Sequence, residues 1–546
     1  MNKKLMVLLL LLSMLVAFAA CKKDSDQGGA GGAYDETFSF SAMINSRGVD
    51  NSVSPAHIAW REKMAELMGM NIDLDIDYVP DGEYDDKIRI MISSGDLPDY
   101  FLLPFLYDYG PMARDGMLLD FSGYNMPNYM SMVNQSFFGR ETAFMADGTM
   151  PVIVQVILPI TDPSNMPIFQ TNAMWNYTAF QREGITIPQT LDELHQSAQL
   201  FKEKYPSSFP INVNYAGIFA FFHAHHMYAN TNGPSTLYWN GNEFTFAGLQ
   251  PQYREAVEYV RMLVSEGLFD PEYIIDTPDT IKTKMMNEEN FMLLNAWRTH
   301  ATEYTRDSGG SQVFVNAFVP DNPRYGKAWQ SFSRDNQVSL LNWTVHAVSS
   351  SFAEPELMAK FLDFQFIPEV YEISSWGIEG VTYTVQADGS KRYVDEFFEA
   401  DDYTRVTDQY GLWNDRSGRA EPTLRLIQHN TPREISFPTN DYNYFGGVYE
   451  ESPTQTSTFF RNASWPNEYV PPHYDAPPVQ LTEDEHNQAS IVLTQMETFG
   501  EQMQAGFIAG EIGMEEWERY MNDFLGYEYQ MVLNIYNAAA RRLLGN

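Results

Sequence analysis

The sequence predicts an α/β fold, because two stretches of the chain alternate strand-like and helix-like patterns. In the first stretch, residues 71–79 (NIDLDIDYV) alternate apolar and acidic side chains, which is typical of a half-buried strand. Residues 55–68 and 84–92 have helical spacing, and residues 37–44 and 100–103 form short strand-like segments. The order strand, helix, strand, helix, strand is the crossover unit of a parallel sheet.

A second α/β stretch follows this unit. Residues 188–204 predict a helix whose N-cap is Thr190, and Glu193 stands three residues later, as in a capping box. Residues 251–266 predict another amphipathic helix, and the apolar run 291–296 predicts a buried strand.

The remainder of the chain predicts one more strand and helix, a long region of loops, and a helical C-terminus. Residues 343–349 predict a strand and residues 355–365 a helix, whereas residues 380–480 are rich in Tyr, Pro, Asn and Asp and predict mostly loops. Three helices are expected at the end of the chain, over residues 482–505, 513–525 and 527–544.

Length and charge limit the possible functions. The chain has 546 residues, a formal net charge of −37 and one cysteine. The length predicts more than one domain, and the 44% apolar content is sufficient for packed cores. Because a nucleic-acid binder needs a basic surface, the acidic chain is not expected to bind DNA or RNA. A single cysteine excludes internal disulfides and zinc sites built from several thiolates.

The N-terminus predicts export and lipidation. Lys3 and Lys4 precede an apolar run over residues 5–20, which is short for a membrane span and typical of a signal peptide. The small residues before Cys21 resemble a lipoprotein signal, although Phe18 stands where Leu is usual. We therefore expect a signal peptide over residues 1–20, a lipidated Cys21, and a flexible tether over residues 21–36. An ordinary cleavage site beside a free cysteine is the alternative.

Four segments together resemble the family 1 extracellular solute-binding lipoproteins of ABC-type importers, which include alginate-oligosaccharide binders. They are residues 84–100, which end in Ser-Gly-Asp-Leu-Pro-Asp-Tyr, residues 187–200, residues 376–383 (WGIEGVTY), and residues 507–541. Each segment alone is weakly specific, but their order and spacing along the chain make the resemblance strong.

The resemblance implies a two-lobe fold of the type 2 periplasmic-binding-protein kind, with the ligand in a cleft between the lobes. Lobe one would hold residues 37–157 and 338–370, and lobe two residues 158–337 and 371–546. The implied function is capture of an oligosaccharide and its delivery to an ABC transporter permease. We expect a monomer without enzymatic activity or cofactor, bound to the membrane only by its lipid. It would lie on the outer face of the cytoplasmic membrane or in the periplasm.

Two segments invite a metal interpretation, and for both we expect no metal. Many relatives have a calcium loop after a helix ending Phe-Lys-x-Lys, but residues 201–210 (FKEKYPSSFP) lack the oxygen ligands that calcium needs. In residues 223–226 (HAHH), the histidines share one face only pairwise, and no carboxylate stands at useful spacing. A polar or partly buried histidine cluster is the preferred interpretation.

A sugar is recognised by flat aromatic surfaces and by planar hydrogen-bonding groups. Trp297 and Arg298 follow a predicted strand, where ligands bind in open α/β sheets. Trp376 and Glu379 lie in the WGIEG segment beside two glycines. The further candidates, for each of which core packing is the alternative, are Trp175, Trp239, Arg334, Tyr129 and Trp343.

Two other functions remain as alternatives. A peptide or other small solute could be the ligand, because the fold does not fix what the cleft binds. A secreted glycoside hydrolase would need two carboxylates flanking a glycosidic bond. The charge of −37 disfavours acidic sugars without excluding them, because arginines such as Arg298 and Arg334 can bind a uronate carboxylate.

Overall fold

The structure is a computed structural model of the whole chain. It describes residues 34–46, 52–104, 109–136, 138–157, 168–169, 171–213, 217–330, 332–333, 339–387, 389, 391–394, 409–412, 427–428, 441–445, 448–452 and 476–545.

The first sheet has six strands in the order β16-β4-β13-β3-β1-β2. Strand β1 pairs in parallel with both β2 and β3, so the predicted crossover unit is confirmed. Strand β13 runs antiparallel to both β3 and β4 and returns the chain to this sheet. The strands are β1 (Thr37–Ser46), β2 (Asn71–Pro80), β3 (Tyr100–Pro104), β4 (Val152–Ile157), β13 (Ser339–Val348) and β16 (Ile427–Gln428).

Helices pack on the first sheet and complete lobe one. Trp60 of α2 is buried, and its indole N–H donates a hydrogen bond of 2.8 Å to Gln365, which follows α13. This bond fixes α2 against the end of α13, although 305 positions separate the two bonded residues. The helices are α2 (Pro55–Met68), α3 (Asp81–Ser94), α4 (Gly110–Arg114), α5 (Pro127–Gln135), α6 (Gly139–Ala143), α13 (Pro355–Phe364) and α14 (Pro368–Trp376).

The second sheet also has six strands, in the order β18-β17-β11-β6-β10-β7. Strand β6 is antiparallel to both β10 and β11, and β7 is parallel to β10. The strands are β6 (Thr171–Asn176), β7 (Ile211–Val213), β10 (Met292–Trp297), β11 (Phe314–Ala317), β17 (Asp441–Phe445) and β18 (Val448–Ser452).

Helices on the second sheet complete lobe two. The predicted capping box is present at α8: Thr190 accepts the Glu193 backbone N–H at 3.2 Å, and Glu193 accepts that of Thr190 at 3.1 Å. The helices are α7 (Tyr177–Glu183), α8 (Leu191–Lys204), α9 (Phe219–Ala224), α10 (Pro251–Ser265), α11 (Pro278–Met286) and α12 (Arg298–Asp307).

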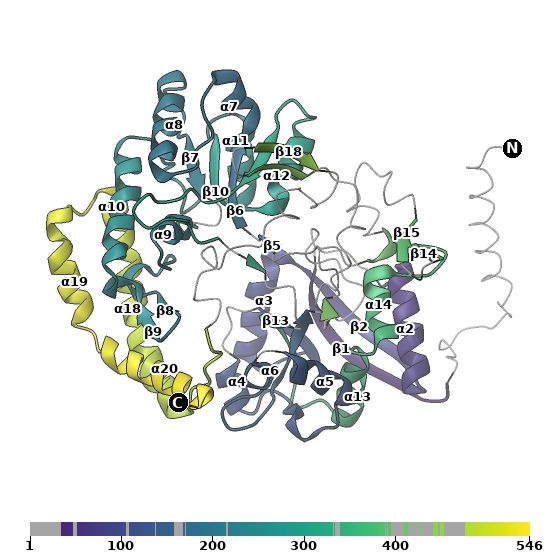
Figure 1. Cartoon of the computed structure of the whole chain (residues 1–546). Helices are drawn as coiled ribbons and strands as arrows, with labels where there is room; N and C mark the ends of the chain where they lie inside the picture. The colour runs from purple at the N-terminus through teal and green to yellow at the C-terminus, as the bar shows by residue number, and fades with distance from the viewer. Residues whose placement is uncertain are drawn as a thin grey trace, which may run out of the picture.

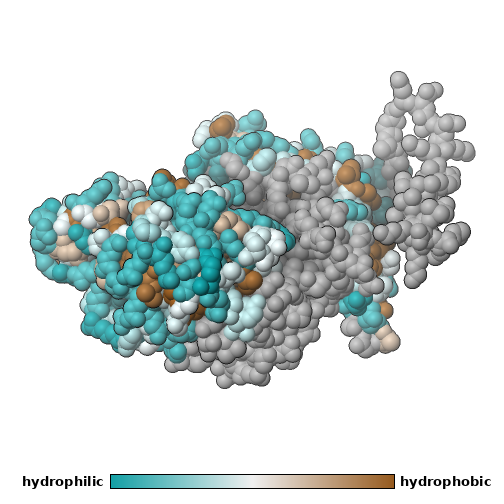
Figure 2. Space-filling model, turned by 90° about the horizontal axis from the view of Figure 1, so that it is seen from above, coloured by the Kyte–Doolittle hydropathy of each residue, from teal (hydrophilic) through white to brown (hydrophobic). Residues whose placement is uncertain are grey.

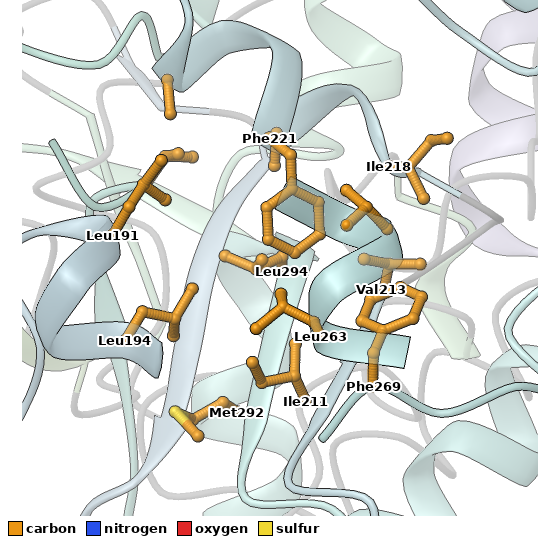
Figure 3. Packing of buried hydrophobic residues seen from close by; sticks show 14 of the residues in the cluster. Leu191, Leu194, Ile211, Val213, Ile218, Phe221, Leu263, Phe269, Met292 and Leu294 are labelled. Carbon is orange, nitrogen blue, oxygen red and sulfur yellow. The ribbon is translucent and has the colours of Figure 1, made fainter. Parts of the chain in front are cut away.

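The core of lobe two explains how a strand as short as β7 is held in this sheet. Ile211 and Val213 of β7 are fully buried, and so are Met292 of β10 and Phe221 of α9. Figure 3 shows these side chains meeting others from α8, α10 and the segment after α10. Helix packing thus stabilises a strand of only three residues.

A two-stranded pair lies between the two sheets (Figure 1). It consists of β5 (Ile168–Phe169) and β12 (Phe332–Ser333), which pair antiparallel, and we call it the crossing pair. Strand β5 stands between β4 of the first sheet and β6 of the second in the sequence, and β12 stands between β11 and β13. The chain therefore passes between the lobes twice at this pair.

Three C-terminal helices pack on lobe two, and the segment before them contacts lobe one. They are α18 (Glu483–Ala509), α19 (Trp517–Leu525) and α20 (Tyr529–Leu544), and α18 and α20 contact α10 and β9 respectively (Figure 1). Strand β9 (Phe244–Phe246) forms a hairpin with β8 (Leu237–Trp239). Just before α18, the side-chain amide of Gln480 donates a hydrogen bond of 2.9 Å to the backbone oxygen of Glu141 on α6.

The segment after residue 370 is divided differently from the prediction, which assigned residues 371–546 to lobe two. Trp376 clusters with Tyr393 and Leu412 against Ala56 of α2, and β16 joins the first sheet. The small hairpin of β14 (Tyr383–Val385) and β15 (Lys391–Tyr393) belongs to this cluster. Its aromatic side chains find their apolar partners on α2, which the linear pattern does not show.

The coloured part of the face shown in Figure 2 is mainly hydrophilic, with small hydrophobic groups. Among the residues that the structure describes, no helix combines the length and the apolar character that a membrane crossing requires.

A buried ionic network holds the end of lobe two where β7 and β10 begin. The Lys284 ammonium lies 3.0 Å from Asp270, 2.8 Å from Glu272 and 2.8 Å from Asp276. Asn212 donates to Asp276 at 3.0 Å and to Asn290 at 3.0 Å. Burial lowers the pKa of Lys284, but the hydrogen bonds to the three carboxylates outweigh it and hold the pKa above its usual range. Lys284 therefore stays charged and ties α11 to both strands.

Replacing Lys284 with Met should destabilise lobe two. The change leaves two nearly buried aspartates without their cation, and breaking such a pair costs about 3 kcal/mol. Urea unfolding measures the loss. Lys63→Met, which breaks the exposed Lys63–Glu66 pair, is the matched control and should change the unfolding free energy by less than about 1 kcal/mol. Equal effects of the two substitutions would contradict the structural role of Lys284.

Candidate functional site

Both sheets direct strand ends toward the crossing pair. In the first sheet, the register of β1 with β2 and β3 places the carboxyl ends of all three strands at one edge. In the second sheet, β6 begins immediately after β5, so its antiparallel neighbours β10 and β11 end beside the crossing pair. We call these the crossing edges of the two lobes. Ligands of open α/β sheets bind outside the carboxyl ends of the strands.

Trp297 and Arg298 lie at the crossing edge of lobe two. Trp297 is the last residue of β10, pairs with Thr171 and is partly buried. The register of β10 shifts between Leu294 and Ala296, and Asn295 between them has φ +54°. Such a bulge re-aims the side chains that follow it. Arg298 is the first residue of α12, and its side chain lies outside the described part of the structure.

Trp343 occupies the corresponding place in lobe one. The register of β13 shifts between Leu341 and Val345, so Trp343 lies within the irregular stretch, next to Thr344, which pairs with the last residue of β3. Only the backbone position of Trp343 is described. Each lobe therefore carries a predicted tryptophan at a strand irregularity on its crossing edge, and contact of either with a ligand stays a prediction.

The WGIEGVTY segment forms a tightly bonded loop around a buried tryptophan. Trp376 is 4% exposed and packs on Tyr393, with ring centroids 4.8 Å apart. The Thr382 hydroxyl donates a 2.6 Å hydrogen bond to the Trp376 carbonyl. Gly377 has φ +79°, and a Cβ at this position would lie 2.4 Å from Thr382 Oγ1. Trp376 is therefore a packing residue in this structure, whereas Glu379 is exposed on the loop.

Three other predicted aromatic residues are packed inside the lobes. Trp175 and Tyr129 expose 0% of their surface, and Trp239 exposes 7%. The Tyr129 hydroxyl accepts the Val154 backbone N–H at 3.1 Å, and burial raises the pKa of this phenol. Trp239 packs on Phe244 beside α20. In this structure these residues supply cores, so we build the candidate site without them.

Some predictions fall on residues that the structure does not describe. Arg334 and Cys21 lie outside the described residues, as do the signal segment and the first part of the tether.

An aromatic group that the sequence analysis did not select lies on the crossing edge of lobe two. It consists of Phe219, His223, His226, Tyr228 and Trp329, and we call it the aromatic shelf. The His223 ring lies 5.5 Å from Phe219, 5.9 Å from Tyr228 and 6.3 Å from Trp329 between centroids. His223 is buried, and the four others are partly buried. A partly exposed set of rings around a buried one offers flat surfaces to a ligand.

Two connections place the shelf at this edge. Helix α9, which begins at Phe219, follows the carboxyl end of β7, and Figure 1 shows it at the end of lobe two nearer to β5. Trp329 stands three residues before β12 of the crossing pair, and its backbone N–H donates to the His223 carbonyl at 3.3 Å. The signal in the sequence is the run FFHAHHMY, of which residues 223–226 predict a polar or partly buried histidine cluster rather than a metal site.

The histidines of this run have structural partners. His225 is buried, donates from Nδ1 to the Phe221 carbonyl at 2.7 Å, and has a pKa lowered chiefly by burial. Within the described part of the chain, no group of three or more His, Cys, Asp or Glu side chains is arranged to hold a metal ion. In the segment where relatives have a calcium loop, the Lys202 ammonium donates to the Ser208 carbonyl at 2.7 Å.

His300 extends the crossing edge into the first turn of α12. Its ring stacks on Tyr304, with centroids 5.4 Å apart and an interplanar angle of 16°. Its Nδ1 atom is buried and has no hydrogen-bond partner among the described residues. Burial, reinforced by the charge of Lys282, lowers the pKa of His300 to about 4.

Comparison with known proteins finds a family model and a relative that are similar to this chain in sequence. Residues 56–279 match the family model described as bacterial extracellular solute-binding protein. A polygalacturonan/rhamnogalacturonan-binding protein of Bacillus subtilis is 20% identical over 397 residues, which cover 70% of this chain and 74% of the relative.

Solved structures share the fold over nearly the whole chain. An HMO-binding, ABC-transporter-associated solute-binding protein of Bifidobacterium longum infantis superposes with a TM-score of 0.66 at 13% identity, covering 93% of this chain and 98% of its own. The alginate-binding protein AlgQ2, solved without calcium ion, gives 0.67 at 17% identity with the same coverage of both chains. The predicted two-lobe fold is confirmed by these structures.

The folded chain should lose stability as the pH falls from about 6.5 to about 4, and His300 should cause part of this loss. The pKa of an unfolded histidine is about 6.5, so between these values the unfolded chain binds a proton that folded His300 does not. His300→Phe keeps a ring on Tyr304 and should reduce the loss by about 1–3 kcal/mol. Urea unfolding at pH 7.5 and pH 5 measures it, with His486→Phe as control. An unchanged pH dependence in His300→Phe would contradict the assignment.

Proposed function

We propose that this chain, of which residues 56–279 match the bacterial extracellular solute-binding protein model, is a member of that family, captures an oligosaccharide between its two lobes and delivers it to an ABC transporter permease. We further propose that it acts as a lipid-anchored monomer on the outer face of the cytoplasmic membrane or in the periplasm, with Cys21 as the anchor. The signal-like residues 1–20 support the anchor.

The observation that carries the proposal is the aromatic shelf at the crossing edge. A pyranose ring presents C–H groups on its faces and hydroxyls around its rim, so aromatic faces beside polar groups complement it. Phe219, Tyr228 and Trp329 are partly exposed at the edge where ligands of such sheets bind. Trp297 and Trp343 stand at crossing edges as well, one in each lobe.

The relatives support a sugar as the ligand. Their names refer to polygalacturonan, rhamnogalacturonan, HMO and alginate as ligands. The net charge of −37 opposes long-range attraction of a polyanion, although a local arginine such as Arg298 can pair with a carboxylate. We therefore propose an oligosaccharide and leave its charge to experiment.

We propose that the protein performs no chemistry on this ligand. Transport requires that the sugar leaves intact, and the mechanism consists of binding and closure. A ligand shifts the lobes toward the closed form by the difference between its affinities for the two forms. The permease then recognises the closed protein, so selectivity depends on contacts at the crossing edges.

Thermal unfolding of residues 22–546 against neutral and uronic oligosaccharides tests the proposal. Binding to the folded state raises the melting temperature by mass action, so one glycan class should give a dose-dependent increase. Chromatography of the same samples should recover the glycan uncleaved.

Each alternative predicts a different outcome. Release of shorter sugars would identify a hydrolase. A shift with a peptide mixture, and none with any glycan, would favour a peptide receptor on the same scaffold and overturn the sugar proposal. No shift with either would leave the fold without this function.

A further inference from the structure

His226 is one of four non-glycine residues in the described chain whose backbone has positive φ. Its φ is +56°, and the others are Phe138, Glu288 and Asn295. This left-handed conformation is uncommon for a residue with a Cβ, although histidine, like asparagine, adopts it more often than most residues. Strain of this kind persists where the surrounding structure fixes it, and it is concentrated at functional sites.

The His226 ring holds Trp329. The two rings are nearly parallel, with centroids 5.3 Å apart and an interplanar angle of 7°. His226 also donates from Nε2 to the Lys327 carbonyl at 2.7 Å, two residues before Trp329. The ring plane and the backbone that carries Trp329 are therefore both fixed by one side chain.

A backbone hydrogen bond is a second link between the two segments. The Trp329 backbone N–H donates to the carbonyl of His223, three residues before His226. The turn after α9 and the segment before β12 thus hold each other at two points, although 103 positions separate the two stacked residues in the sequence.

The same environment explains why the strained residue is not glycine. Glycine would relieve the backbone but would remove both the stacked ring and the Lys327 bond. At Glu288, which also has positive φ, the side chain instead makes two 2.8 Å bonds to Arg182, an ion pair away from the shelf. At His226 the side chain is used to orient an aromatic ring.

We infer that His226 is a positioning residue that sets the plane of Trp329, and that Trp329 is the surface on which a sugar ring stacks. This inference rests on the proposed function, because it assigns residues to the same site. A tryptophan whose plane is fixed before binding loses little rotational freedom on stacking, so the ligand retains more of the contact energy.

His226→Gly separates this role from a role in folding. Because relief of the left-handed strain offsets the loss of the stacked ring and of the Lys327 hydrogen bond, the melting temperature should change little, while the Kd for the glycan should increase about tenfold. His226→Phe keeps a ring in the same backbone and should stay within about threefold of the wild type. Isothermal titration measures Kd with the glycan class that shifts the melting temperature most.

Phe138→Gly is the matched control. Phe138 is an aromatic residue with φ +54°, next to α6 in lobe one, so the substitution removes a ring and a strained backbone elsewhere. It should leave the glycan Kd unchanged. An equal rise in Kd for Phe138→Gly would show that any such change disturbs closure, and it would overturn the specific role of His226.

A double-mutant cycle tests whether His226 acts through Trp329. Trp329→Ala should raise the Kd at least as much as His226→Gly, and the double variant should bind no more weakly than Trp329→Ala alone, because coupled residues are not additive. Additive effects, or an unchanged Kd in either single variant, would overturn the inference while glycan binding by the wild type still supports the proposed function.

Failure of the proposed function has a different signature. If the wild type binds no glycan, the near-ultraviolet circular dichroism of the free proteins still reports the stack. His226→Gly should then change the tryptophan bands that Trp329→Phe also changes. Absence of both glycan binding and this change would overturn the proposal and the inference together.

Discussion

The structure depends on the constraint that parallel strands impose on their connections. Strands β1, β2 and β3 run in the same direction, so the helices between them bring every carboxyl end to one edge of the first sheet. Strand β6 enters the second sheet directly after β5, which turns the ends of β10 and β11 toward the same crossing pair. Residues from distant parts of the chain meet at these edges because backbone hydrogen bonding leaves them no other position.

Regular pairing is interrupted where a ligand would bind. The shift in β10 at Asn295 precedes Trp297, the shift in β13 includes Trp343, and His226 is left-handed beside Trp329. The opposite end of lobe two is tied by Lys284 to three carboxylates. Strain is therefore placed at the crossing edge, and a dense ionic network holds the far end of the sheet. A lobe built in this way keeps its shape while its edge is available for binding.

Local sequence patterns predicted the fold better than they predicted the candidate site. Alternation over residues 71–79 and the Thr190 capping box predicted elements that the structure contains, because both depend on neighbours within a few residues. For an aromatic residue, the neighbouring sequence does not show whether the side chain lies in a core or at a binding edge. Trp175 in a core strand and Trp329 on the shelf look alike in sequence, and the difference is made by partners such as His226, which lies 103 positions away from Trp329. The position of Trp376 against α2 depends on a similarly distant contact.

The contact between Gln480, which precedes α18, and lobe one bears on how much energy the proposed closure would cost. Gln480 is held on lobe two, where its carbonyl accepts from Arg542 at 3.4 Å and the preceding Val479 packs beside Trp239. Its amide supplies a donor to Glu141, one of the last carbonyls of the short helix α6, which lack partners within the helix. A hydrogen bond of this kind contributes about 1 kcal/mol net, so a closing motion that exchanges it for another partner needs little energy from the ligand. Under the proposed function, affinity would then be set mainly by the contacts at the crossing edges, and the orientation of Trp329 before binding would be a variable by which the chain tunes it.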